Sequence, residues 1–185
     1  MKATMMSIII LGAIELMAQV TINEKNNYCE ITDSSIAGIR IGEKVEYIQT
    51  DNAFKLERTS DGDGVALISV LKNGIEVVQI WAGEDNTEQP IEINNKVLSL
   101  QTFNNSCKME NGLHPGSKIS DVEKIYGKKL EIEISEIESR ENIKLNNNGR
   151  KMNIRVDGAG KYNKNSNKTR DYNSKKEILS ISIYQ

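Results

Sequence analysis

Hydrophobic residues in the middle of the chain form two short runs on either side of a tight turn. The stretch GVALISVLKNGIEVVQIWAG places the runs 65–71 and 75–81 around Lys72-Asn73-Gly74. An Asn-Gly pair supplies the two positive φ angles of a type I′ turn, the strongest short signal for a β-hairpin. Both runs are nearly continuously apolar, so we expect a central hairpin that is also covered on part of its second face.

Segments with alternating or β-branched composition predict further strands. KLEIEISEI alternates, with Leu130, Ile132 and Ile134 opposed by Glu131 and Glu133. That pattern indicates a half-buried strand with an acidic outer face. Composition and alternation predict the other strands at 28–32, 91–93, 97–103, 152–156 and 177–184. The fold class expected from these patterns is α+β and mostly β, with an antiparallel sheet and two short helices in a single domain.

Two stretches share a pattern of glycine, aliphatic and lysine positions. GIRIGEKVEYI begins at Gly38 and GLHPGSKISDV begins at Gly112, and both read Gly, aliphatic, two variable residues, Gly, polar, Lys, aliphatic. This pattern predicts an internal repeat over 38–50 and 112–127, in which a glycine turn leads into a short helix. A chance similarity of two short segments is the alternative.

The second of these helices has clear start and stop signals. Ser120 is the expected N-cap, and Glu123 three residues later would complete a capping box. Val122 begins a buried stripe, and Gly127 suits the left-handed position that ends a helix. This segment is therefore expected to serve the fold.

The N-terminal residues MKATMMSIIILGAIELMAQ have the pattern of a signal peptide. Lys2 gives a positive start, and the apolar run 7–18 is too short to span a bilayer. We predict a signal peptide over 1–19 and one exported β-rich domain over 20–185, periplasmic or extracellular. A buried N-terminal helix of a cytosolic protein is the alternative. No cysteine directly follows the apolar run, so we expect neither a lipidation cysteine nor a transmembrane anchor after cleavage.

Cys29 and Cys107 remain after removal of the signal peptide. In an oxidising compartment an even pair favours one disulfide that closes a long loop. Two free thiols or an intermolecular bond are the alternatives. A metal site is disfavoured, because these cysteines and the single histidine lack the spacing of metal ligands.

Composition argues against several classes of ligand. The formal net charge is −2 and aromatic residues make up 5% of the chain, so we expect no nucleic-acid partner. Gly158 and Gly160 follow no strand–helix pattern of a nucleotide-binding loop. We expect no cofactor.

His114 and Ser117 are the residues that most resemble a catalytic pair. A serine nucleophile also needs an orienting third group, oxyanion donors and an exposed elbow of the G-x-S-x-G type, which the sequence lacks. We therefore expect a turn at Pro115-Gly116 and predict no catalytic residues.

Two acidic loops are weak candidates for a metal or catalytic site. Asp61 and Asp63 have the spacing that begins a calcium loop, but the later ligands and the bidentate glutamate are missing. Glu84 and Asp85 are explained by turn chemistry. We predict no metal site, with a plain turn at Asp61 and Asp63.

The chain resembles the RpoE-regulated lipoprotein family of the bacterial envelope. The resemblance is carried by VLSLQTF, ENGLHPGSKISDVEKIYGK, MNIRVDGAG and EILSISIY, and it covers roughly residues 65–185. It implies a small exported β-rich domain and assigns no reaction to any residue. The glycine-turn-helix unit also resembles small outer-membrane assembly lipoproteins of the SmpA/OmlA type, where it is a packing element.

These observations favour an exported, non-catalytic envelope module that binds an unidentified envelope or secreted protein. The first alternative is an inhibitor of a secreted hydrolase, which would insert the loop 82–90 or the polar, basic loop 158–176. The second alternative is a small enzyme or calcium-binding module that uses Asp61, Asp63, Glu84 or His114. The loop 158–176 is expected to be long and flexible.

Overall fold

The turn at Asn73-Gly74 forms the predicted hairpin. In the computed structural model, which describes residues 29–62, 64–135, 139–147 and 150–184, β5 (Ala66–Lys72) pairs antiparallel with β6 (Ile75–Trp81). Asn73 and Gly74 have φ angles of 54° and 77°, as a type I′ turn requires. The predicted signal peptide over 1–19 lies outside the described residues.

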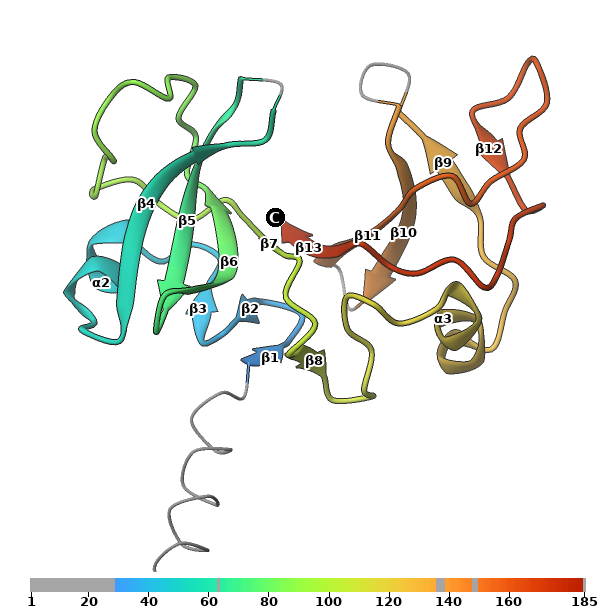
Figure 1. Ribbon diagram of the computed structural model, residues 1–185, viewed down its shortest axis with the longest axis horizontal. Helices are drawn as coiled ribbons and strands as arrows, with labels where there is room; N and C mark the ends of the chain where they lie inside the picture. The colour runs from blue at the N-terminus through green and yellow to red at the C-terminus, as the bar shows by residue number, and fades with distance from the viewer. Residues whose placement is uncertain (1–28, 63, 136–138, 148–149, 185) are drawn as a thin grey trace, which may run out of the picture.

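This hairpin belongs to a nine-stranded sheet in which every pairing is antiparallel (Figure 1). In order across the sheet, its strands are β12 (Lys168–Thr169), β9 (Ile132–Ile134), β10 (Glu141–Asn147), β11 (Arg150–Val156), β13 (Ser180–Tyr184), β7 (Ser99–Thr102), β6, β5 and β4 (Phe54–Ser60). The fold is α+β and mostly β, in a single domain, as the sequence predicts.

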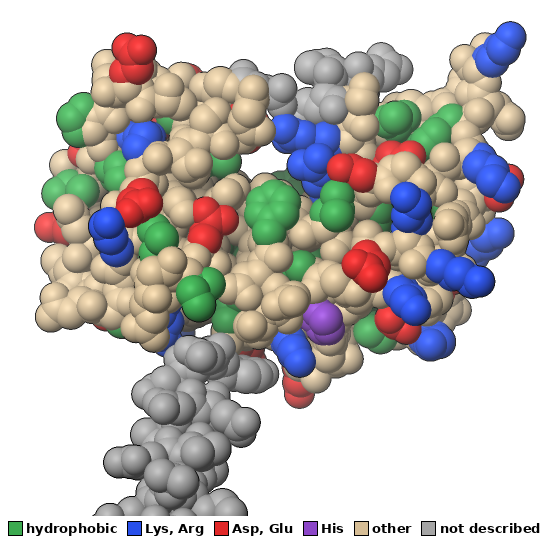
Figure 2. Space-filling view, in the orientation of Figure 1, with side chains coloured by type: hydrophobic (Ala, Val, Ile, Leu, Met, Phe, Trp, Pro, Cys, Tyr) green, Lys and Arg blue, Asp and Glu red, His purple; other side chains and the backbone are tan. Residues whose placement is uncertain are grey.

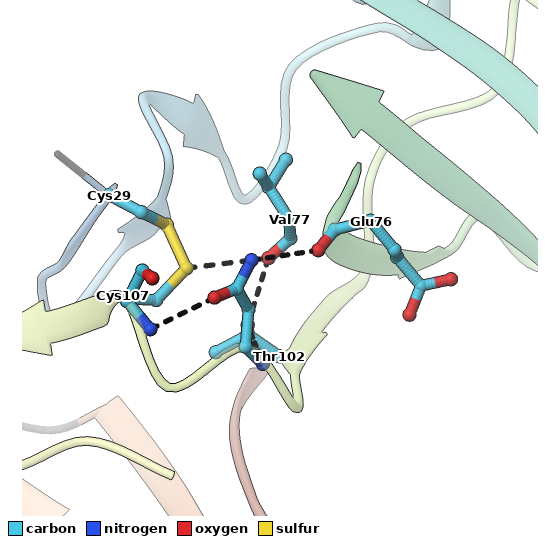
Figure 3. The surroundings of a disulfide bond; sticks show 7 residues. Cys29, Glu76, Val77, Thr102 and Cys107 are labelled. Atoms are coloured by element: carbon cyan, nitrogen blue, oxygen red, sulfur yellow. Dashed lines mark hydrogen bonds between the residues drawn. A yellow bond between two sulfur atoms is a disulfide. The ribbon is translucent and has the colours of Figure 1, made fainter. Parts of the chain in front are cut away.

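A second, smaller sheet contains the two cysteines. Its strands are, in order, β3 (Ile39–Arg40), β2 (Ser35–Ile36), β1 (Cys29–Ile31) and β8 (Cys107–Met109). β1 and β8 run parallel with Cys29 opposite Cys107, and the two residues form a disulfide. The sulfur of Cys107 lies 3.6 Å from the Val77 carbonyl oxygen, so the bond packs directly against β6 (Figure 3).

The helices α2 (Val45–Thr50) and α3 (Ile119–Tyr126) lie in the predicted segments, but the predicted N-cap of α3 is wrong. Lys118 is the N-cap, and its N–H donates to the Asp121 carboxylate at 3.1 Å. Ser120 lies inside the first turn instead, because Lys118 forms a β-bridge with Glu177 and starts the helix earlier. Gly127 ends the helix at φ 62°, as expected.

One hydrophobic core lies between the inner face of the large sheet and a layer formed by both helices and the small sheet (Figure 1). Strand residues at alternate positions face this core, which is why isoleucine, valine and leucine recur there. The largest fully buried side chains include Ile31, Ile68, Ile80, Leu100, Ile119, Ile132, Ile143, Ile154 and Ile181. Among the described residues, no helix is long and apolar enough to cross a membrane.

Several local predictions differ from the structure, and strands β8 and β10 lie outside the predicted ones. Strand β4 was not predicted, because FKLERTS has few apolar residues to show its alternation. The segment 91–93 forms a turn, not a strand, and its Ile93 carbonyl accepts from the N–H of Glu46 at 2.9 Å. The loop 158–176 is not free: β12 pairs with β9, and the Tyr172 hydroxyl bonds Leu130 and Glu123.

The two glycine turns make corresponding backbone hydrogen bonds. The Gly42 N–H donates to the Val97 carbonyl at 2.8 Å, and the Gly116 N–H donates to the Ile178 carbonyl at 2.8 Å. Both glycines have positive φ, 88° and 93°, which glycine adopts without a Cβ clash. Each turn is thereby tied to the segment that leads into a central strand, β7 or β13.

The two helices also begin alike. The Val45 N–H donates to the Asn95 carbonyl at 3.0 Å, and the Ile119 N–H donates to the Lys176 carbonyl at 2.9 Å. Both first residues are fully buried. Each helix is therefore held by the segment that precedes β7 or β13.

The large sheet consists of two arrays that meet at its centre. The arrays β4-β5-β6-β7 and β9-β10-β11-β13 each run inward from an outer edge, with β12 added outside β9. β7 pairs with β13, and Gln101 lies directly opposite Ser182. We call residues 29–106 the first half of the domain and residues 107–184 the second half.

Candidate functional site

His114 and Ser117 form a turn and not a nucleophile–base pair. The Ser117 hydroxyl accepts from the backbone N–H of His114 at 3.1 Å, while the imidazole Nδ1 lies 2.6 Å from the Pro115 carbonyl oxygen. Gly116 completes the turn with φ 93°. A serine protease-like arrangement needs the imidazole to accept from the hydroxyl, and no hydrogen bond between these two side chains is found among the described residues.

Asp61 is engaged by its own turn and by the second half of the domain. One carboxylate oxygen accepts from the Val65 N–H at 3.2 Å, and the other lies 4.0 Å from the Arg140 guanidinium. Arg140 also donates to the Asp61 carbonyl at 3.2 Å. Asp63 lies outside the described residues. Within those residues, no three His, Cys, Asp or Glu side chains are grouped so that they could hold a metal ion.

Glu84 fixes the loop that follows β6. Its carboxylate pairs with Arg58 of β4 and accepts from the Glu92 N–H at 3.3 Å. Arg58 also donates to the Pro90 carbonyl at 2.9 Å. Asp85 is exposed. Glu84 therefore holds the loop 82–90 on the sheet.

The outer face of the large sheet is a candidate binding surface, which we call the open face. Side chains alternate between faces along a strand, so those between the core positions point away from the helices. One row crosses four central strands in register: Gln79, Gln101, Ser182 and Asn153. Among the described residues, the helices and the small sheet all lie on the opposite side (Figure 1).

An aromatic row lies beside this polar row. Trp81 pairs with Ser99, Ser99 with Tyr184, and Tyr184 with Lys151. The Lys151 ammonium lies 5.9 Å from the centre of the Tyr184 ring, within cation–π range. Trp81 is half-buried, and its buried indole Nε1 has no hydrogen-bond partner among the described residues. The open face thus combines two aromatic rings with many hydrogen-bonding groups.

Hydrogen bonds between side chains fix the polar groups of the open face. Gln101 donates to the Ser180 hydroxyl at 2.8 Å, which joins the two central strands. Asn153 donates to the Asn142 amide oxygen at 2.9 Å on the second half. Gln79 donates to the Glu76 carboxylate at 3.0 Å on the first half. These bonds span both halves and limit the side-chain freedom that a binding partner would have to restrict.

A groove at the junction of the two halves exposes large apolar side chains. Ile75, Phe103 and Leu179 are 60%, 44% and 40% exposed and line a groove of about 590 Å³. We call it the junction groove. Its remaining lining residues are Glu76, Asn104, Asn105, Pro115, Gly116, Glu177 and Ile178.

A smaller pocket of about 230 Å³ lies near the outer edge of the second half. Five cations and two glutamates line it, over a floor of leucine and isoleucine. Lys144 lies 2.9 Å from Glu133, and its hydrogen bond lowers the pKa of that carboxyl. Lys168 lies 3.7 and 3.8 Å from Glu131 and Glu133. Because Lys144, Lys168 and Arg170 pair with these glutamates, the pocket contains a mixed ion-pair network.

The sequence did not identify the junction groove. Its three apolar residues come from separate segments and meet only in the folded chain. One signal was present: Phe103 has the parity of the polar residues Ser99 and Gln101, while Leu100 and Thr102 are buried. Strand parity therefore places Phe103 on the solvent side.

Comparison with known proteins identifies the fold and no family. No family model matches the chain, and no curated protein matches it. The structure is similar to the crystal structure of the uncharacterised protein yfeY from Escherichia coli, with a TM-score of 0.56 and 12% sequence identity. The likeness covers 84% of this chain and 99% of yfeY. The chain therefore shares the overall fold of an uncharacterised Escherichia coli protein.

Proposed function

We propose that this protein is an exported, non-catalytic module that binds a protein partner through the open face. Export is supported by the signal-like pattern of residues 1–19 and by the Cys29–Cys107 disulfide, which suits an oxidising compartment. The resemblance to RpoE-regulated envelope lipoproteins supports the same placement.

The aromatic row is the observation that carries the proposal. Solvated outer faces are common in antiparallel sheets, but Trp81 and Tyr184 add two large rings at the centre of this one. Tryptophan and tyrosine are the residues that most often dominate protein interfaces, because they bury much area with little loss of side-chain entropy.

We propose a non-catalytic role because the candidate catalytic side chains already form contacts that stabilise loops. Ser117 closes a backbone turn, Asp61 meets Arg140, and Glu84 meets Arg58. In the part of the chain that the structure describes, these residues fix loops and do not form a shared reaction centre.

Alanine substitution on two surfaces tests the proposal. The purified protein, immobilised, captures proteins from envelope extract and culture medium, and quantitative mass spectrometry compares Trp81→Ala, Tyr184→Ala and Tyr47→Ala with the unchanged chain. Tyr47 is the matched control, because it is 62% exposed and lies on α2, away from the open face. We expect one partner to be depleted at least tenfold by Trp81→Ala and retained by Tyr47→Ala. Equal capture by all variants, each with a native melting transition, contradicts the proposal.

Inhibition of a secreted hydrolase is a second candidate function, favoured by a projecting turn before β12. The turn is braced by a hydrogen bond from the Ser166 N–H to the Asn163 carbonyl at 3.1 Å, and it extends beyond the body of the domain (Figure 1). A braced, projecting loop is the form in which an inhibitor enters a cleft. Inhibition assays against a panel of secreted hydrolases, with Lys164→Ala beside the unchanged chain, test this function. Loss of inhibition with Lys164→Ala but not with Trp81→Ala would favour it over the open face.

A further inference from the structure

We propose that the junction groove binds a partner segment that presents aliphatic side chains next to a lysine or arginine. The inference rests on the proposed function, because it names the kind of partner and adds a second contact surface. The groove continues the open face, since Phe103 follows Gln101 at the same strand parity.

Apolar exposure is the first observation. Ile75 begins β6, Phe103 directly follows β7 and Leu179 directly precedes β13, yet the three line one groove. Single exposed apolar residues are common on protein surfaces, whereas three that line one shallow groove form the kind of cluster that marks a binding surface. Covering these three side chains would remove apolar area from water, which favours binding.

Charge is the second observation and defines the partner. Glu76 and Glu177 line the groove, and none of its described lining residues is a lysine or an arginine. Glu76 receives hydrogen bonds from two neutral side chains, Ser69 and Gln79. Neither glutamate forms an ion pair with a described residue. Burying such a carboxylate without a cation is costly, so a tightly fitting segment would place a lysine or arginine beside it.

The same charges argue against a second copy of this chain as the occupant. Joining two such grooves about a two-fold axis would bring Glu76 and Glu177 of one copy against the same residues of the other. Like charges at short range destabilise an interface. A heterologous segment with a cation avoids this repulsion.

The groove is held in shape by the fold. The Gly116 N–H donates to the Ile178 carbonyl at 2.8 Å, and the Asn104 side-chain amide donates to the Glu76 carbonyl at 2.9 Å. A surface with fixed backbone needs little reorganisation on binding, which favours recognition of short segments.

Peptide titration of the isotopically labelled, mature protein tests the inference. The probe is an acetylated peptide with two leucines and one lysine, and the matched control peptide carries glutamate in place of lysine. Methyl NMR follows Ile75 and Leu179, with Ile125 of α3, 38% exposed, as the internal reference. We expect saturable shifts at Ile75 and Leu179, no shift at Ile125, and at least fivefold weaker binding of the control peptide.

Two variants sharpen the test. Glu177→Lys should reverse the preference between the two peptides, and Phe103→Ala should weaken binding of both at least threefold. Equal binding of both peptides, or shifts that include Ile125, overturns the inference. Because this titration needs no captured partner, it can fail while Trp81-dependent capture persists; the reverse result would contradict the proposed function alone.

Discussion

The two halves of the domain share a backbone plan and differ in what their surfaces carry. Each begins with a cysteine, makes a glycine turn, a short helix and an inward array of strands. Yet residues 29–106 contain 13 Asp and Glu against 6 Lys and Arg, and residues 107–184 contain 11 against 16. On the face shown in Figure 2, Lys and Arg side chains gather over the second half. The shared plan depends on glycines, buried aliphatic residues and backbone hydrogen bonds. The charged surface side chains do not determine this backbone plan, so they can differ between the halves and contribute to binding.

The largest expected effect comes from removing the bond between the halves. Cys29→Ser with Cys107→Ser opens a link between residues 78 apart in sequence. Restriction of the unfolded chain by such a link stabilises a domain by about 4 kcal/mol. Urea unfolding of the double variant should show this loss, and the unchanged chain in reductant is the control. A loss below about 1 kcal/mol would show that the halves hold together without the link.

Truncation of one buried isoleucine in each helix tests whether the two halves unfold together. Ile48 in α2 and Ile119 in α3 are 3% and 0% exposed. Each change to alanine should cost about 2–4 kcal/mol, because it leaves a cavity in the common core. Calorimetry should show one transition in both variants. Two separate transitions would contradict a single domain core.

Much of this plan was predictable from the sequence. The Asn73-Gly74 hairpin and both helices follow from local signals that tertiary contacts do not override. The N-cap at Lys118 was not predictable, because its β-bridge with Glu177 is non-local. The ordering of 158–176 depends on Tyr172 meeting Glu123 and Leu130, contacts for which sequence spacing gives no cue. The junction groove is missed for the same reason.

Matched glycine substitutions test the two turns at a smaller scale. Gly42→Ala and Gly116→Ala should each cost about 1–2 kcal/mol, because an L-residue is strained at φ 88° or 93°. At Gly116 a Cβ would meet nothing closer than 3.9 Å, so strain and not a clash is expected. Gly116→Asn should recover part of the loss, measured by urea unfolding. An equal loss for alanine and asparagine would point to crowding instead.

The smallest expected effect on stability distinguishes Lys118 from Ser120 as the N-cap of α3. The Lys118 N–H holds the pKa of Asp121 below its usual value, so this contribution to stability is present above the unfolded pKa of 3.8 and is lost as pH falls through the lower folded value. Asp121→Asn should lower the melting temperature slightly at pH 7 and not at pH 2. Ser120→Ala should leave the melting temperature nearly unchanged. If Ser120→Ala lowers the melting temperature more than Asp121→Asn does, Ser120 is the N-cap after all.

Site-specific photo-crosslinking tests the central claim, that partners bind the open face, most directly. A photoreactive phenylalanine replaces Gln101 at the centre of that face or Tyr47 on α2, in cells that export the full chain. We expect one discrete crosslinked adduct from position 101 and none from position 47. Adding Trp81→Ala should reduce the adduct from position 101. Adducts from position 47 alone, or adducts at 101 that persist with Trp81→Ala, would contradict it.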